Sequence, residues 1–85
     1  MQRDFIIANE QGVHARPATL LVANANKYKC DITITYDGLT VDLKSIMGVL
    51  SLGVTRGSLI TIRIEGVDEV EALKEITKLL NEINR

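Results

Sequence analysis

The strongest constraint on the fold is a turn dipeptide, Asp37-Gly38, placed between two stretches of alternating residues. Apolar and polar side chains alternate through residues 30–36, which is the period-two pattern of a strand with one buried face. Asp-Gly suits a two-residue hairpin turn because both of its positions need a positive φ. The alternation resumes through residues 39–43, so the sequence predicts a β-hairpin over residues 30–43.

Two further strands and three helices are predicted around this hairpin. Isoleucines alternate with polar residues over Leu59–Glu65, and a short apolar segment at residues 5–8 predicts a fourth strand. Ser45 is a good N-cap for the second helix, and Asp68 with Glu71 resembles a capping box at the start of the third. Apolar residues recur at helical spacing in the three predicted helices, which cover residues 16–27, 45–52 and 68–85.

The predicted order of elements is strand, helix, strand, strand, helix, strand, helix (βαββαβα). Each helix has one apolar stripe and each strand has one apolar face. The sequence therefore predicts a single α+β domain over residues 1–85, with a four-stranded antiparallel sheet, three helices on one face and solvent on the other. Hydrophobic residues make up 46% of the chain and aromatic residues only 4%, so we expect an aliphatic core.

Composition and charge argue against several classes of protein. A net charge of −1 gives no electrostatic basis for binding nucleic acid, and no apolar run approaches the roughly 18 residues of a membrane-spanning helix. A single cysteine, Cys30, cannot form an internal disulfide, which fits a reducing cytoplasm. One histidine and one distant cysteine do not supply the ligands of a metal site. We expect a cytoplasmic protein without metal or cofactor.

The residues best suited to chemistry lie where the first strand gives way to the first helix. Pro17 fits the first turn of a helix, which places His14 at or just before the N-cap, where free N–H groups and the helix dipole favour an anion. Neutral imidazole is a nucleophile, and a phosphoryl group on nitrogen transfers onward readily. Arg16 can donate to phosphate oxygens, and Gly12 permits a tight backbone turn that leaves the ring exposed. The pattern favours phosphoryl carriage on His14 over an exposed histidine without function.

A second segment combines an N-cap serine with more apolar residues than a short helix can bury. Ile46, Met47, Val49 and Leu50 cannot all face the core, so some of them are expected to form a docking surface for partner proteins. Ser45 could accept a phosphate without loss of the helix, because the charge would lie at the positive end of the dipole. A plain N-cap serine on a half-buried helix accounts for the same spacing.

Both segments resemble a known family. Residues 12–18, Gly-Val-His-Ala-Arg-Pro-Ala, resemble the active-centre motif of HPr, the histidine-containing phosphocarrier protein of the bacterial phosphoenolpyruvate-dependent sugar phosphotransferase system. Residues 44–49, Lys-Ser-Ile-Met-Gly-Val, resemble the regulatory segment of the Gram-positive form of that family. Length and element order also match, so the resemblance covers nearly the whole chain.

The resemblance implies an open-faced β-sandwich with the strand order 1-4-2-3. It implies that His14 takes a phosphoryl group on Nδ1 from enzyme I and passes it to the IIA components of sugar permeases. Arg16 would assist, and Gly12, Ala15 and Pro17 would shape the helix start and the phosphate environment. The protein would then be a phosphoryl carrier, expected as a monomer, rather than a stand-alone enzyme.

The same resemblance implies regulation through the second segment. Ser45 would be the target of HPr kinase/phosphorylase, and the serine-phosphorylated form would act with a catabolite control regulator in carbon catabolite repression. Ile46, Met47 and Leu50 match the apolar docking surface of the family. A regulatory interaction module of the same fold, not engaged in sugar transport, remains the alternative.

Overall fold

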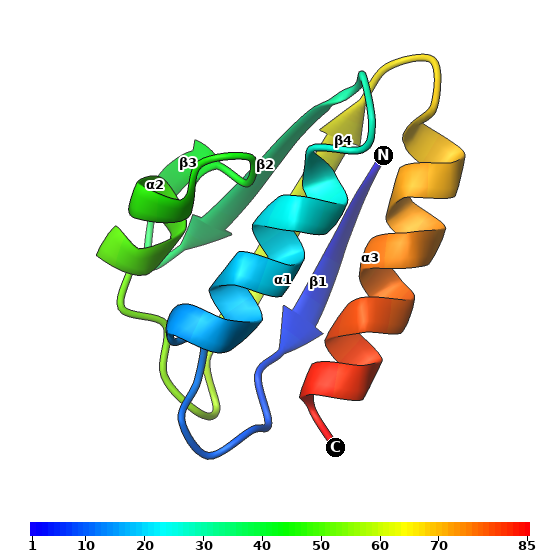
Figure 1. The fold of residues 1–85 in the computed structure, drawn as a ribbon. Helices are drawn as coiled ribbons and strands as arrows, with labels where there is room; N and C mark the ends of the chain where they lie inside the picture. Colours follow the sequence, from blue (N-terminus) through cyan, green and yellow to red (C-terminus); the bar gives the residue numbers. More distant parts are fainter.

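The computed structural model describes residues 1–85 and confirms the predicted α+β fold. Its four strands form one antiparallel sheet in the order β1-β4-β2-β3. Helices α1 and α3 lie side by side across one face of this sheet, and α2 lies next to β3 (Figure 1). The elements are β1 (Gln2–Ile6), α1 (Ala15–Ala25), β2 (Asp31–Tyr36), β3 (Leu39–Asp42), α2 (Ile46–Ser51), β4 (Leu59–Glu65) and α3 (Glu69–Ile83).

The predicted hairpin is present and has the predicted turn. Asp37 and Gly38 have φ values of 50° and 79°, and the strands on either side pair from Tyr36 with Leu39 onward. Both turn residues are therefore in the left-handed region that a two-residue hairpin requires. The return strand is shorter than predicted, since β3 ends at Asp42.

The first strand differs from the prediction in its bounds. It covers Gln2–Ile6 rather than residues 5–8. The N–H of Ile7 donates to the carbonyl of Ser58 (2.9 Å), but the carbonyl of Ile7 accepts from Gly57 (2.7 Å) instead of Ser58. Two residues thus oppose one, as in a β-bulge, and the regular ladder stops there. Ile7 is fully buried all the same.

The start of α3 also differs from the prediction. Asp68 is the N-cap, but its side chain makes no capping bond to its own helix, so the predicted capping box with Glu71 is wrong. The Asp68 carboxylate instead accepts the backbone N–H groups of Lys29 (2.9 Å) and Cys30 (3.0 Å). Asp68 therefore joins the beginning of α3 to the segment before β2. These donors, that of Lys29 first, lower the pKa of the Asp68 carboxyl.

The core between the sheet and the helices is aliphatic, as predicted, with Phe5 as its one aromatic residue and no buried polar or charged residue. The inward-facing isoleucines of β2 and β4 are almost completely buried, and Leu21, Ile76 and Leu80 cover them from the helices. Cys30 is buried at the edge of this core. None of the three helices is both long and apolar enough to cross a membrane.

Candidate functional site

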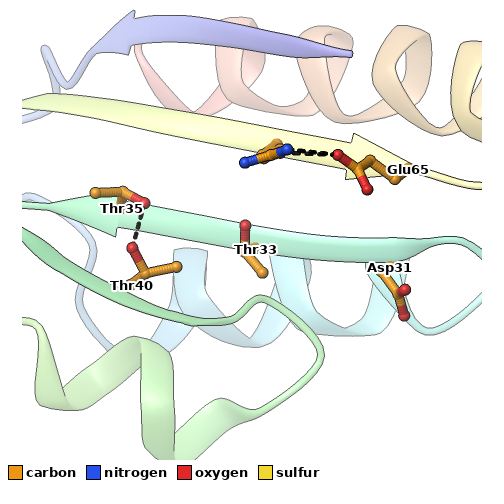
Figure 2. Close-up of a pocket in the computed structure, with 6 residues that line it drawn as sticks. Asp31, Thr33, Thr35, Thr40 and Glu65 are labelled. Carbon is orange, nitrogen blue, oxygen red and sulfur yellow. Dashed lines mark hydrogen bonds and ion pairs between the residues drawn. The ribbon is translucent and has the colours of Figure 1, made fainter.

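The outer face of the sheet carries a shallow polar depression (Figure 2). The hydroxyls of Thr35 and Thr40 lie 2.7 Å apart, and the Arg63 guanidinium donates to the Glu65 carboxylate at 2.7 Å. These four side chains form hydrogen bonds with one another in pairs, and none of them is a strong nucleophile. This face matches the solvent-exposed side of the sheet that the sequence predicts. The depression is lined by Asp31, Thr33, Thr35, Thr40, Arg63 and Glu65.

The loop after β1, the loop before β4 and the end of α3 come together at one end of the molecule, where α1 begins (Figure 1). His14 lines a hollow there with Arg56 and Asn84. It is the N-cap residue of α1, with extended backbone angles (φ −88°, ψ −168°). Its side chain is exposed and makes no capping bond. The structure thus places the imidazole in the open at the start of a helix.

The loop that carries His14 is fixed by contacts with distant parts of the chain. The N–H of Val13 donates to the carbonyl of Val54 at 3.0 Å. The side chain of Asn84 accepts from the N–H of Ala8 and donates to the carbonyl of Ile6, both at 2.9 Å. These bonds hold the loop at both ends, so the position of His14 depends on the loop before β4 and on the end of α3 as well as on α1.

The first turn of α1 has free donors beside His14. The first bond within the helix runs from the N–H of Ala18 to the carbonyl of His14 (3.0 Å), and Pro17 has no N–H to offer. The N–H groups of Ala15 and Arg16 have no partner in the chain. The Arg16 side chain is exposed and forms no ion pair. This end of the helix can therefore receive an anion held on the imidazole.

Two shallow hollows adjoin His14. One includes Arg16 together with Leu20 of α1 and Leu79 of α3, and the other includes Arg56 and Arg85. Arg56 lies in a tight turn, in which the N–H of Ser58 donates to the carbonyl of Thr55 (3.2 Å). Each hollow is thus lined by at least one arginine and one glutamate, Glu82 in the first and Glu10 in the second. Sequence analysis did not identify Leu20 or Arg56, because neither belongs to a local motif.

A backbone carbonyl lies beside the imidazole. Nδ1 of His14 lies 3.4 Å from the carbonyl oxygen of Gly12. The same oxygen accepts a much shorter hydrogen bond, of 2.6 Å, from Nδ2 of Asn9. In this rotamer Nδ1 faces the chain, so the ring has to turn before Nδ1 can meet an incoming group.

The second segment forms the short helix α2 with the predicted N-cap. The Ser45 hydroxyl accepts from the N–H of Gly48 at 3.1 Å, and Ser45 is exposed. Met47 is 75% exposed and Leu50 is 38% exposed, whereas Ile46 is half-buried and packs partly against the core. Of the three predicted docking residues, Met47 and Leu50 present most surface.

Comparison with known proteins identifies the family. Residues 1–82 match the family model described as the PTS HPr component phosphorylation site. The chain belongs to the HPr family. It is similar to HPr-C-His from Thermoanaerobacter tengcongensis, with 39% identity over 99% of this chain and 94% of that chain and a TM-score of 0.93. It is also similar to the HPr of Bacillus anthracis, with 44% identity over 93% of this chain and 94% of that chain and a TM-score of 0.87.

A further HPr-like neighbour is Crh, the catabolite repression protein of Bacillus subtilis. It is 37% identical over 98% of this chain and 95% of that chain, with a TM-score of 0.76, and its structure is a swapped, intertwined dimer. The family and fold support a general role as a phosphocarrier of the phosphotransferase system for this HPr-type chain. The Crh match shows that a protein named for catabolite repression shares the same fold.

Proposed function

We propose that this chain is a cytoplasmic HPr that accepts a phosphoryl group from phospho-enzyme I on Nδ1 of His14 and delivers it to IIA components of sugar permeases. The observation that carries the proposal is the exposed imidazole at the N-cap of α1, beside the unpartnered N–H groups of Ala15 and Arg16. Free amides and a guanidinium stabilise an anion at this position.

The chemical step needs a neutral ring that has turned away from the carbonyl of Gly12. The lone pair of Nδ1 then attacks phosphorus, the bond between phosphorus and the donor breaks, and its electron pair leaves with the donor. The Arg16 guanidinium and the free N–H groups neutralise the charge on the phosphoryl oxygens. Gly12 and Pro17 fix the backbone on either side of His14. Gly12 lies in the loop between β1 and α1, and Pro17 lies in the first turn of α1.

Reconstitution tests the carrier function directly. Incubation with phosphoenolpyruvate and enzyme I is expected to label His14 with a phosphoryl group that is acid-labile and alkali-stable, and His14→Ala is expected to abolish the label. Arg16→Gln should slow labelling by about tenfold to a hundredfold, the value of a lost hydrogen bond to a charged group. Arg16→Lys should recover part of the rate. Absence of label on the unaltered chain would refute the proposal.

We also propose that Ser45 is a regulatory phosphorylation site for HPr kinase/phosphorylase, and that the modified form acts with a catabolite control regulator. Its hydroxyl is exposed and caps α2, so a phosphate there would keep the charge at the helix start. Met47 and Leu50, on the same helix, would serve as apolar contacts for the protein partners. Incubation with the kinase and ATP should phosphorylate the chain but not Ser45→Ala.

The second candidate is a purely regulatory interaction module, which the likeness to Crh favours. The two functions differ in the His14 reaction, since only the carrier needs phosphoryl acceptance from enzyme I. We propose that the carrier acts as a monomer, in contrast to the intertwined Crh dimer. Absence of labelling of His14 in the folded protein would favour the regulatory module, and a dimer mass in sedimentation would overturn the monomer.

A further inference from the structure

We propose that Asn9 controls which nitrogen of the neutral His14 ring carries the proton. By donating to the carbonyl of Gly12, Asn9 favours the form with the proton on Nε2, which leaves Nδ1 available to the phosphoryl group. Asn9 is thus a positioning residue that acts through Gly12. The kinetic consequence rests on the proposed carrier function, whereas the location of the ring proton is a property of the chain itself.

The contacts around Gly12 place Asn9 and His14 on the same acceptor. The Asn9 side chain donates from Nδ2 to the Gly12 carbonyl oxygen at 2.6 Å, and the N–H of Gly12 donates back to the Asn9 carbonyl at 3.1 Å. Gly12 is buried, and a buried carbonyl is normally hydrogen-bonded. The other group near this oxygen is Nδ1 of His14, at 3.4 Å.

The two distances show which donor holds the carbonyl. A separation of 2.6 Å is a short, strong hydrogen bond, whereas 3.4 Å lies beyond the usual range for N–H···O. A neutral imidazole has one proton, on either Nδ1 or Nε2. A proton on Nδ1 would be favoured by a carbonyl without a partner, and it would occupy the site that the phosphoryl group needs. Because Asn9 already donates a hydrogen bond to the Gly12 carbonyl oxygen, an Nδ1–H group would gain little from a hydrogen bond to the same oxygen. The Nδ1–H form of His14 is therefore less favoured.

The state of the Asn9 side chain supports a role for its N–H group. Its Oδ1 atom is buried without a hydrogen-bond partner, although buried polar atoms are normally paired. The amide orientation follows from Gly12, because a carbonyl oxygen accepts only and must face Nδ2. Asn9 also lines both hollows that adjoin His14. The Asn9 amide therefore leaves its Oδ1 atom without a hydrogen bond while its Nδ2 atom keeps the bond to Gly12.

Nitrogen NMR of the neutral ring tests the proposal, and His14 is the single histidine of the chain, so its signals are unambiguous. In the unaltered protein the form with the proton on Nε2 should predominate. Asn9→Leu, which keeps much of the volume but removes the donor, should raise the ratio of Nδ1–H to Nε2–H by about twofold to tenfold, the value of one net hydrogen bond. Phosphoryl acceptance from enzyme I should slow by no more than the same factor.

Asn26→Leu is the matched control. The Asn26 amide donates to the carbonyls of Val22 and Lys44 at the far end of α1, so its loss removes similar bonds without touching Gly12. The ratio of Nδ1–H to Nε2–H in His14 should not change in this variant. Asn9→Ala provides a second test of the donor if Asn9→Leu fails to fold.

Three results would overturn the proposal. They are a predominant Nδ1–H form in the unaltered protein, an unchanged ratio of Nδ1–H to Nε2–H in a folded Asn9 variant that is phosphorylated at the normal rate, and an unchanged ratio in a folded Asn9 variant that is phosphorylated more slowly. The last result would assign Asn9 a purely structural role. If the unaltered protein accepts no phosphoryl group from enzyme I, the carrier function fails, and the ring ratio still decides the role of Asn9.

Discussion

Gly12 lies directly against the backbone of Val54, with no room between them for a side chain. Gly12 has a φ of +64°, and a Cβ atom there would overlap the Val54 carbonyl and lie 2.8 Å from Cα of Thr55. The hydrogen bond from Val13 to Val54 (3.0 Å) keeps the two segments together at this point. The close approach fixes the loop two residues before the imidazole.

Gly12→Ala should therefore destabilise the protein by about 2–5 kcal/mol, the sum of a left-handed backbone and an overpacked contact. Gly53 is the matched control, because it has the same φ of +64° and open space where a Cβ would be. Gly53→Ala should cost only about 1–2 kcal/mol. Urea unfolding of the two variants measures the difference, and equal losses would show that the contact with Val54 is not tight.

The apolar surface of α2 can be tested without disturbing the fold. Met47 is 75% exposed, so Met47→Asp should change the free energy of unfolding by less than about 0.5 kcal/mol. If Met47 contacts enzyme I, the same change should raise the Km for phosphorylation by about tenfold, as expected for loss of an interface anchor. Val70→Asp, at an exposed valine of α3, is the control and should leave the Km unchanged.

The link between Asp68 and the segment before β2 should make stability depend on pH. The pKa of the Asp68 carboxyl is lowered below its ordinary 3.8, first by the N–H of Lys29, so the ionised form favours the folded state. This stabilisation is complete above the ordinary pKa and is lost as the pH falls through the lower, folded-state value. Urea midpoints measured from about pH 5 down to about pH 2 should fall less steeply in Asp68→Asn than in the unaltered protein.

Asp31→Asn is the control for that series, because Asp31 is exposed and its carboxylate, unlike that of Asp68, accepts no backbone N–H. Its midpoints should follow those of the unaltered protein. If the urea midpoint changes with pH as steeply in Asp68→Asn as in the unaltered protein, the bonds to Lys29 and Cys30 do not make the ionised Asp68 carboxylate stabilise the folded state.

Cys30 should be unreactive in the folded protein. Burial, followed by the neighbouring Asp68 carboxylate, raises the pKa of the Cys30 thiol to about 11. Near pH 8 only about one thiol in a thousand is then ionised, and the thiolate is the reactive form. A thiol reagent such as dithionitrobenzoate should modify Cys30 more than about a hundredfold faster in urea than in buffer. Rapid modification in buffer would contradict this.

Features with a local cause were predictable from the sequence. The hairpin follows from Asp37-Gly38, whose φ values match the turn, and the N-cap roles of His14 and Ser45 follow from Pro17 and from the serine itself. Each depends on a few neighbouring residues with strong backbone preferences. The strand order was expected from family resemblance and is confirmed.

Features that depend on distant contacts were not predictable. Asp68 reads as a helix cap, but it bonds Lys29 and Cys30, because the fold brings their N–H groups to its carboxylate. The bounds of β1 depend on the bulge with Gly57, which lies fifty residues further along the chain. Asn9 and Arg56 belong to loops without a pattern, and only the folded structure places them beside His14.

The bonds from Val54 and Asn84 to the loop of His14 also bear on biosynthesis. If His14 is the phosphoryl acceptor proposed above, a nascent chain that has emerged only through α1 contains the acceptor but not the residues that hold its loop. These bonds form only after residue 84 has left the ribosome and α3 has docked. Phosphoryl acceptance would then depend on completed folding of the chain.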